Sequence, residues 1–428
     1  MTTPGHYRPA VAIVGGATAG AEAAEKLSAA GALCAVFEQN DRPYGKVEDG
    51  LPRWHENLRL KEYAAIDAKL DRAGVHFIPR TGVGHEIGFG ELVDGWGFDL
   101  VLLANGAWRD RPLPVLNADT YVNRGLIYQN PFIYWFNHYE EPGYNGPSYA
   151  IADGTIIVGG GLASIDVAKV VQLELVARAL WARGIRQDLL EMEVDGVSET
   201  LARHGLVWPD LGLGGCTLYY RRRIEDMPLA EAPAGASAAQ LEKIGTVRRR
   251  ILEKAQSKFL FNVEPLWAPV GLLTHGDQLD GLRFARTRLD ENGRAVGVAG
   301  EIRNVQAPVV ISSIGSIPQP IEGLPMDGEL LRLEDLELGA VVGFSHVFGC
   351  GNVVTGKGNL VASRRHSAQV ATRLIERLES LAGAGESNGR LAGIERRIAE
   401  RQKAVGYDGS YAAWAARVSP PEARSREP

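Results

Sequence analysis

Short apolar runs recur along the chain, and each leads through a glycine-rich turn into a stretch of helix-forming residues. The first run, residues 11–14, enters the turn 15–20, which precedes a helical stretch over 21–30 and a second apolar run over 32–37. A continuous apolar run of this length is typical of a strand buried on both faces of a sheet. The pattern therefore predicts an α/β fold in which glycine turns join strands to helices.

The same pattern returns further along the chain. Residues 155–158 form a buried strand before the triple glycine 159–161, a helix follows over 165–171, and the matching second strand is expected over 216–220. Apolar and helical spacings predict further elements: a helical insertion over 173–213, a basic helix over 247–256, a strand over 308–315, a strand and turn over 346–352, and a helix over 361–378.

The C-terminal stretch differs in composition. Residues 381–390 are rich in glycine and serine and are typical of a linker, and a helix is expected over 391–405. The aromatic residues Tyr407, Tyr411 and Trp414 follow, and they either pack back on the body of the protein or mediate dimerisation. Residues 419–428 are expected to be frayed.

The composition sharpens this picture. Glycine accounts for 51 of the 428 residues, where an average usage near 7% gives about 30. The formal net charge is −6, so no overall positive charge favours nucleic acid or an anionic membrane surface. The three cysteines are far apart and form no C-x-x-C pair, so neither a zinc site nor a disulfide redox centre is predicted, and we expect no metal.

The compartment is predicted from the same features. No basic and then apolar leader opens the chain, and no apolar run reaches the ~18–20 residues that a membrane span needs. The odd number of cysteines argues against a secreted disulfide scaffold. We therefore expect a cytoplasmic protein that does not bind a membrane.

The first glycine turn has the residue types that dinucleotide binding requires. Gly15 allows the tight turn, Gly20 allows close helix packing, and the helix N-terminus that follows favours a pyrophosphate. Ala17 replaces the middle glycine and adds one methyl group. Glu38 lies 23 residues after Gly15, close to the ~20 of a dinucleotide fold, and can accept hydrogen bonds from ribose hydroxyls. The alternative is a glycine-rich turn without a ligand.

The second glycine turn predicts a different nucleotide. The residues expected to face its pyrophosphate are Gly159, Gly161, Leu162, Ala163 and Ser164. The matching strand ends in Arg221 and Arg222 rather than in an acid. Arginine binds a 2′-phosphate that an acid would repel, so this site should prefer NADP(H). A solvated basic loop is the alternative.

Two such folds in one chain, the first ending in an acid and the second in arginines, indicate FAD in the first and NADPH (NADP+) in the second. A protein that holds both is most simply a flavin-dependent pyridine-nucleotide oxidoreductase. Hydride transfer between nicotinamide and flavin needs alignment rather than an acid or a base.

Six segments of the chain resemble the adrenodoxin-reductase-like flavoproteins and the small subunit of glutamate synthase. They are residues 43–55 (P-x-G-x-x-x-x-G-x-x-P-x-H, with Pro52 one place early), 132–137 (F-V-x-W-Y-N), 159–168 (G-x-G-N-V-A-x-D-V-A), 220–228 (Y-R-R-x-x-x-E-M-P of the glutamate synthase subunit, with Asp226 for the glutamate), 312–327 (S-I-G and G-L-P-F-D) and 347–352 (a strand and Gly-Asp turn that holds FAD, with Asn352 for the acid). The resemblance covers roughly residues 11–378.

The resemblance implies further site residues. For FAD they are Gly45, Gly106, Gly351, Asn352, Gly358, Asn359 and Leu360. His55 matches the family histidine and is either a titrating group of the active site or a structural, hydrogen-bonded histidine. Asp166 either orients the nicotinamide or His55, or interacts with the first turn of its helix. Two departures from the family pattern are Asn105, where a threonine is usual, and Lys357 in place of a proline that faces the flavin.

The resemblance also implies the architecture. Two Rossmann-like dinucleotide-binding domains of the glutathione-reductase type are expected, with the NADPH domain inserted in the FAD domain. Residues 1–116 and 307–380 are expected to form the FAD-binding domain, residues 117–306 the NADPH-binding domain, and residues 381–428 a linker with a helical extension.

The function expected is that of an FAD-dependent NADPH oxidoreductase resembling ferredoxin–NADP reductases, with hydride transfer to FAD and electron transfer to a ferredoxin or another small electron-transfer protein. Arg248, Arg249 and Arg250 provide either a docking patch for an acidic ferredoxin or a solvated helix face. The alternatives are a flavoenzyme that reduces a small organic substrate or a dedicated partner subunit, a flavin monooxygenase, and a non-catalytic nucleotide-binding scaffold. The sequence does not define the oligomeric state.

Overall fold

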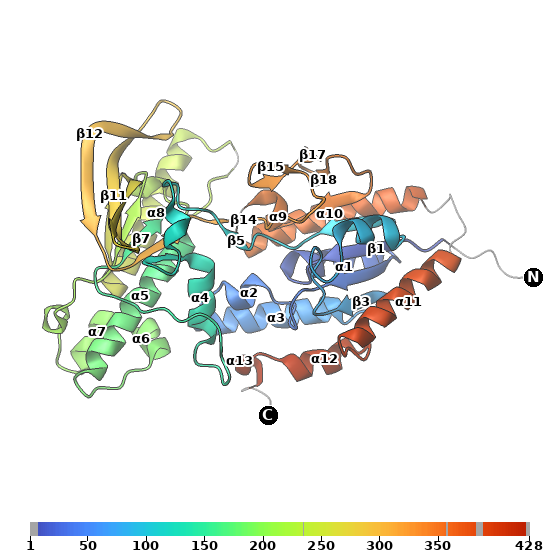
Figure 1. The fold of residues 1–428 in the computed structure, drawn as a ribbon, viewed down its shortest axis with the longest axis horizontal. Coiled ribbons are helices and arrows are strands. Elements are labelled where there is room, and N and C mark those ends of the chain that lie inside the picture. The colour runs from blue at the N-terminus through green and yellow to red at the C-terminus, as the bar shows by residue number, and fades with distance from the viewer. Residues whose placement is uncertain (1–6, 234, 357, 382–387, 425–428) are drawn as a thin grey trace, which may run out of the picture. The chain divides into compact units, whose positions relative to one another are not determined.

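The computed structural model describes residues 7–233, 235–356, 358–381 and 388–424 (Figure 1). The chain divides into two compact units, Met1–Arg109 with Ser316–Pro428, and Asp110–Gly315. The second unit is therefore an insertion in the sequence of the first. Within the described ranges, a helix with the length and apolar surface of a membrane span is not found.

A seven-stranded sheet forms the centre of the first unit, in the order β17-β18-β19-β4-β1-β2-β3. Its strands are β1 (Ala10–Val14), β2 (Leu33–Phe37), β3 (Val75–Ile78), β4 (Leu100–Leu103), β17 (Leu333–Asp335), β18 (Ala340–Val341) and β19 (Val347–Gly349). The strands from β19 to β3 are parallel, whereas β17 and β18 are antiparallel additions at one edge. The loops that follow the parallel strands therefore meet at one edge of the sheet.

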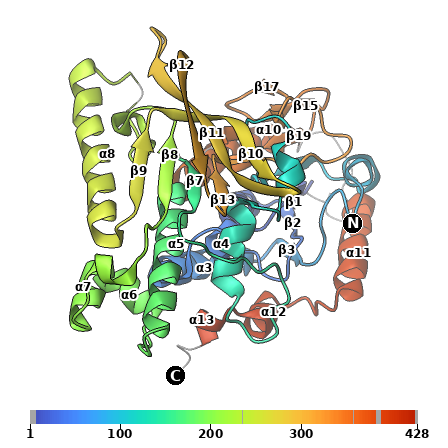
Figure 2. The same cartoon turned by 60° about the vertical axis from the view of Figure 1, so that its left-hand side comes forward.

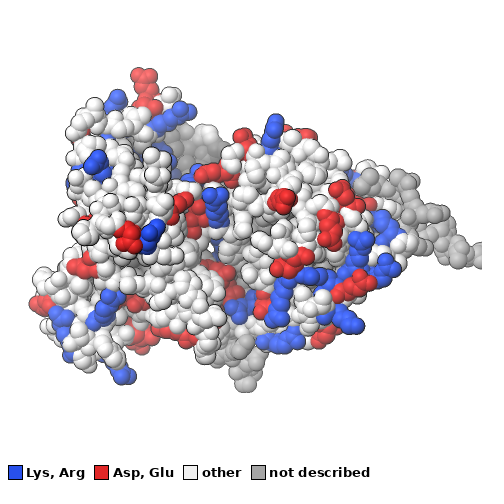
Figure 3. Space-filling model, in the orientation of Figure 1, with Lys and Arg blue, Asp and Glu red and all other residues white. Residues whose placement is uncertain are grey.

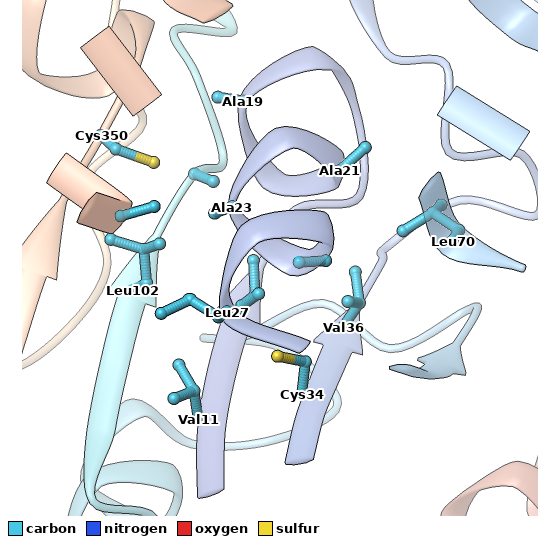
Figure 4. Close-up of a cluster of buried hydrophobic side chains, with 14 of the residues drawn as sticks. Val11, Ala19, Ala21, Ala23, Leu27, Cys34, Val36, Leu70, Leu102 and Cys350 are labelled. Atoms are coloured by element: carbon cyan, nitrogen blue, oxygen red, sulfur yellow. The ribbon is translucent and has the colours of Figure 1, made fainter. Parts of the chain in front are cut away.

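Helices cover both faces of this sheet. Those of the first unit are α1 (Thr18–Ala29), α2 (Lys46–Asp49), α3 (Glu56–Leu70), α9 (Asn352–Thr355), α10 (Leu360–Leu381), α11 (Asn388–Ala404), α12 (Tyr411–Val418) and α13 (Pro421–Arg424). Val11 and Ile13 pack into one buried cluster with α1, α3 and α10, and Figure 4 shows Leu27 directed toward the strands from α1. Ala12 and Val14 point to the opposite face because side chains alternate along a strand.

A parallel five-stranded sheet forms the centre of the second unit, in the order β6-β13-β7-β8-β9. Its strands are β6 (Leu126–Tyr128), β7 (Ile156–Gly159), β8 (Thr217–Tyr220), β9 (Asn262–Pro265) and β13 (Val310–Ser313). Its helices are α4 (Gln129–His138), α5 (Leu162–Trp181), α6 (Leu189–Asp195), α7 (Val197–Arg203) and α8 (Ala238–Phe259). The expected helical insertion is the end of α5 with α6 and α7, and the expected basic helix is part of α8. Two dinucleotide-binding α/β folds are thus confirmed.

An antiparallel three-stranded sheet in the second unit was not expected from the sequence (Figure 2). It is formed by β10 (Trp267–His275), β11 (Gln278–Leu289) and β12 (Ala295–Gln306). The adjacent residues Asn292 and Gly293, at the turn between β11 and β12, are a typical hairpin signal. Four shorter strands complete the fold: β5 (Arg109–Asp110), β14 (Ser316–Ile317), β15 (Met326–Asp327) and β16 (Leu330–Leu331).

The C-terminal segment packs on the first unit. Tyr411 and Trp414 are buried in the same cluster as β1 and α1, so packing on the body of the protein is confirmed for these aromatic residues. Glu422 of α13 forms an ion pair with Arg59 of α3 at 2.8 Å. Fraying from residue 419 is therefore wrong for the described residues up to Arg424. Residues 382–387 of the expected linker and residues 425–428 lie outside the described residues.

Candidate functional site

The two outer glycines of the first turn are required by close backbone contacts. Gly15 has a φ of +97°, its N–H donates to Phe37 O at 2.8 Å, and a Cβ there would lie 2.8 Å from Ala104 O. A Cβ on Gly20 would lie 1.8 Å from the Gly15 carbonyl oxygen. These contacts allow α1 to start directly against the ends of β1 and β4.

The N-terminus of α1 offers backbone N–H groups to an anion. Ala17 is the N-cap residue and supplies no side-chain hydrogen bond, and the first turn contains no acidic residue. The hydroxyl of Thr18 is buried and has no hydrogen-bond partner among the described residues. The unpaired N–H groups and the helix dipole both favour a phosphate at this end.

Glu38 follows β2 and is bound to the glycine turn. Its Oε2 accepts a hydrogen bond from the Gly16 N–H at 2.9 Å, and its Oε1 accepts one from the Asn40 N–H at 3.0 Å. The residue is 5% exposed. Burial raises the pKa of its carboxyl to about 7. The hydrogen bonds from the Asn40 and Gly16 N–H groups lower the pKa, but their effect is smaller than that of burial. The carboxyl is therefore positioned beside the turn, and its remaining lone pairs can accept ligand hydroxyls.

A cleft of about 100 Å³, partly open to solvent, lies at these strand ends in the first unit. Gly15, Ala17 and Glu38 line it, as the sequence predicted for one shared site. The other lining residues include Gly45, Thr81, Gly82, Val83, Gly84, His85, Asn105, Trp108, Gln319, Pro320, Ile321 and Glu322.

Two asparagines follow the ends of β4 and β19. The Oδ1 atoms of Asn105 and Asn352 are buried and have no hydrogen-bond partner among the described residues. Gly351, which lies between the end of β19 and Asn352, has a φ of +71°, and a Cβ there would lie 2.6 Å from Ala19 Cβ. Its N–H donates to His366 Nδ1 at 3.0 Å. An unsatisfied buried acceptor costs about 1–3 kcal/mol, so these amides suit a ligand that carries donors.

The start of α10 is ordered by Asn359. Its Oδ1 accepts hydrogen bonds from two N–H groups of the first turn, at 2.9 and 3.2 Å. Gly358 precedes it and is exposed, and Leu360, the first residue of α10, is half-buried. Lys357 lies outside the described residues.

Three residues implied by the resemblance lie after β2 and β4. Gly45 has a φ of +51° and lines the cleft. Gly106 follows β4 with a φ of +69°. His55 ends the 3-10 turn Arg53–His55, is half-buried, and has its ring centroid 6.1 Å from that of Trp54. It is not one of the residues that line the cleft, so its role stays a prediction.

The second glycine turn leads from β7 into α5. Gly159 ends β7, and Gly161 is the N-cap residue of α5. Leu162 and Ala163 are exposed in a first turn without acidic residues. The N–H groups at the start of α5 are therefore as suited to an anion as those at the start of α1.

Ser164 replaces the third glycine of this motif and is fully buried. Its Oγ donates a hydrogen bond to Ser313 O at 2.9 Å. The Ser313 hydroxyl in turn donates to Gln129 Oε1 at 2.6 Å. The serine thus joins the first turn of α5 to the end of β13, a contact that a glycine could not make.

The arginines after β8 have different surroundings. Arg223 forms two hydrogen bonds with the Asp226 carboxylate, at 2.9 and 3.1 Å. Arg222 Nη2 lies 3.5 Å from Asp226 Oδ1, and its Nε is buried without a partner among the described residues. Arg221 is exposed, and its side chain forms no hydrogen bond or ion pair with any described residue. Arg221 and Arg222 therefore keep donors that a phosphate can use.

Asp166 and the basic helix have contacts within the second unit. Asp166 Oδ1 lies 3.7 Å from Lys169 Nζ, one turn along α5. Arg248 of α8 donates to the carbonyl oxygens of Ala230 and Glu225 at 2.7–2.9 Å, and Arg249 forms an ion pair with Glu225. The roles of Asp166 in orientation and of this helix in docking stay predictions.

Sequence reasoning missed two segments that line the cleft, residues 81–85 and 319–322. Residues 81–85 follow β3, which pairs with β2, so the parallel strand order places them beside Glu38. The short run 75–78, which forms β3, was the sequence signal for this loop, and it was not recognised as a strand. Residues 319–322 follow β14 and carry no motif that could have indicated the cleft.

Comparisons with known proteins agree with the resemblance that the sequence motifs indicated. No family model matches the chain. It is 33% identical to cindoxin reductase of Citrobacter braakii over 173 residues, which is 39% of this chain and 35% of the relative. It is 32% identical to the glutamate synthase [NADPH] small chain of Mycobacterium tuberculosis over 167 residues, 36% of this chain and 32% of the relative. The match thus spans about a third of the length of these relatives.

Two longer matches cover most of the chain. It is 23% identical to the mitochondrial NADPH:adrenodoxin oxidoreductase of Salvelinus fontinalis over 405 residues, 86% of this chain and 77% of the relative. The structure of Mycobacterium tuberculosis FprA in complex with NADPH superimposes with a TM-score of 0.70 at 20% identity, covering 92% of this chain and 91% of FprA, which shows a common fold. The chain is therefore similar to the adrenodoxin-reductase-like proteins over most of its length, and to the glutamate synthase small chain over a shorter stretch, as its motifs indicated.

Proposed function

We propose that the chain is an FAD-dependent NADPH oxidoreductase that passes electrons to a ferredoxin-type protein. The observation that supports this most is the set of unpartnered buried polar atoms after β1, β4 and β19, which are neighbours in the sheet: Thr18 Oγ1, Asn105 Oδ1 and Asn352 Oδ1. Buried polar atoms are normally satisfied, so three in one region favour a polar ligand. The cleft that Glu38 and Asn105 line opens at the same strand ends.

In this proposal the first unit holds FAD. Glu38 accepts hydrogen bonds from the adenosine ribose, and the N–H groups at the start of α1 face the pyrophosphate. Asn352 binds on the flavin side, where its Oδ1 accepts a donor. When bound, FAD supplies the chemistry of accepting a hydride and releasing electrons singly.

The second unit holds NADPH in this proposal. The first turn of α5 faces its pyrophosphate, and Arg221 with Arg222 binds the 2′-phosphate. The common fold with FprA, whose structure contains NADPH, and relatives whose names include NADPH support this choice. The relative named after adrenodoxin supports a ferredoxin-type acceptor. The three cysteines, buried and unpaired, fit the reducing cytoplasm as the compartment.

Reduction of the purified protein tests the proposal directly. After loading with FAD, anaerobic NADPH should bleach the visible flavin absorbance, and cytochrome c reduction should then depend on added ferredoxin. Absence of bleaching would leave only a nucleotide-binding scaffold. Bleaching without a ferredoxin dependence would favour the partner-subunit alternative, for which the likeness to the glutamate synthase small chain is the supporting observation.

The nucleotide preference is tested at the arginines. The double variant R221A/R222A should weaken NADPH binding about tenfold or more and leave NADH binding nearly unchanged, because only NADPH carries the phosphate that these donors bind. Dissociation constants measured by fluorescence titration check this, with R250A, an exposed arginine of α8, as a control for the loss of a surface charge. Equal losses for the two nucleotides would contradict the assignment.

A further inference from the structure

The wall of the cleft in the first unit includes two loops that are bound to each other. Residues 38–42 follow β2 and residues 79–85 follow β3. The Thr81 N–H donates to Glu38 O at 2.7 Å, and the Arg80 N–H donates to Asn40 O at 3.2 Å. Because Glu38 is the proposed ribose acceptor, these loops form the adenosine side of the site. The position of either loop therefore depends on the other.

Helix α11, which lies beside β3 (Figure 1), contacts the second of these loops. Arg401 Nε donates to Thr81 Oγ1 at 2.9 Å, and Arg401 Nη2 donates to Arg80 O at 3.4 Å. The next residue, Gln402, donates from Nε2 to Phe77 O at 2.8 Å. Thr81 is fully buried and lines the cleft. A side chain more than 300 positions away in the sequence thus contacts the cleft wall directly.

Helix α12 contacts the first loop. Trp414 Nε1 donates to Asp41 O at 2.8 Å, and Arg42 Nη1 donates to Val418 O at 3.3 Å. The Arg80 guanidinium lies 5.4 Å from the Trp414 ring and forms an ion pair with Asp41. Trp414 therefore contacts both loops at once.

Arg80 shows why these contacts are needed. Its φ of +50° lies in the left-handed region, which costs a residue with a side chain about 1–2 kcal/mol. Such a conformation persists where the surroundings hold it. The hydrogen bond from Arg401 to Arg80 O and the Trp414 contact are two of those that hold it here.

We propose that residues 388–424 support the wall of the cofactor site from behind, and that Arg401 is a positioning residue for the adenosine side of FAD, acting through Thr81. This rests on the proposed function, since it takes FAD as the ligand of the cleft. Loss of the Arg401 guanidinium leaves the buried Thr81 Oγ1 without this donor and removes two of the hydrogen bonds that hold the loop beside Glu38. The bound cofactor must then order the loop itself, which lowers its affinity.

Three variants test the proposal. R401A removes the donor, R401K keeps one donor, and R396A changes an exposed arginine of the same helix, whose side chain is 72% exposed. Figure 3 shows lysine and arginine side chains among acidic ones on the surface of the first unit. R396A removes one exposed charge of this helix, so it reports the effect of a lost surface charge. We expect R401A to raise the FAD dissociation constant about tenfold, the loss of one hydrogen bond to a charged group. R401K should recover part of this, and R396A should match the unmodified protein.

Hydrogen exchange of the apoprotein supplies a readout that does not depend on FAD. Backbone N–H groups of residues 79–85 should exchange faster in R401A than in R396A, with the rest of the sheet unchanged. Unchanged exchange in these residues, or FAD affinity equal to that of R396A, would overturn the proposal. If the unmodified apoprotein does not bind FAD, the proposed function fails instead, and the exchange data still report whether Arg401 orders the loop.

Discussion

FAD affinity should depend on pH through Glu38. Burial raises the pKa of this carboxyl from an ordinary 4.5 to about 7 in the empty site, a change worth about 3 kcal/mol. Ribose hydroxyls donate hydrogen bonds and so favour the ionised carboxylate, which lowers the pKa again when FAD binds. Binding must therefore release a proton when Glu38 is protonated, and it must tighten as the pH rises.

The magnitude follows from the protonated fraction of the empty site. With a pKa of about 7, that fraction falls from about nine-tenths at pH 6 to about one-tenth at pH 8, so the apparent dissociation constant should fall about tenfold over this range. The stability of the apoprotein should change in the opposite direction. Because the pKa of Glu38 is higher in the folded than in the unfolded protein, the contribution of this carboxyl to stability is fully present below about pH 4.5 and is lost as the pH rises through about 7.

Titration of the apoprotein with FAD, followed by flavin fluorescence, measures the dissociation constant at each pH. Calorimetry in two buffers of different ionisation enthalpy measures the proton released. The variant E38Q cannot ionise and should bind weakly with no pH dependence, whereas E379Q, an exposed carboxylate of α10, should keep the slope. A flat profile for the unmodified protein, or a slope that survives in E38Q, would refute this account of Glu38.

Two further changes test the glycine turns. G20A should abolish FAD binding and lower the stability of the first unit by about 2 kcal/mol or more, because its Cβ would lie 1.8 Å from Gly15 O; G393A, which meets no atom within 4 Å, should be neutral or slightly stabilising in thermal unfolding. S164A should cost about 1 kcal/mol in urea unfolding, since the acceptor Ser313 O loses its donor. A neutral S164A would show that this hydrogen bond contributes nothing.

Much of the local geometry of the two glycine turns could be predicted from sequence pattern. A buried apolar strand, a glycine turn and a helix must follow one another closely, so Gly15, Gly20 and Glu38 were identifiable by spacing alone. Ser164 and Arg221 were placed correctly at a helix start and a strand end for the same reason. Each of these residues acts within its own strand–turn–helix unit, where the backbone geometry is set by neighbours in the sequence.

The tertiary structure decided which distant segments complete the site. The loop at 79–85 lies beside Glu38 only because β3 pairs with β2, and Arg401 contacts Thr81 only because α11 packs against that edge of the sheet. Likewise, Arg223 and Arg221 belong to one basic run in the sequence, but only the tertiary structure shows that Arg223 is hydrogen-bonded to Asp226 and Arg221 is not. Amphipathic spacing predicts which face of a helix is buried, but it carries no information on which other element that face packs against. The sequence alone thus predicted the two glycine turns between strand and helix, and long-range packing determined the walls around the first of them.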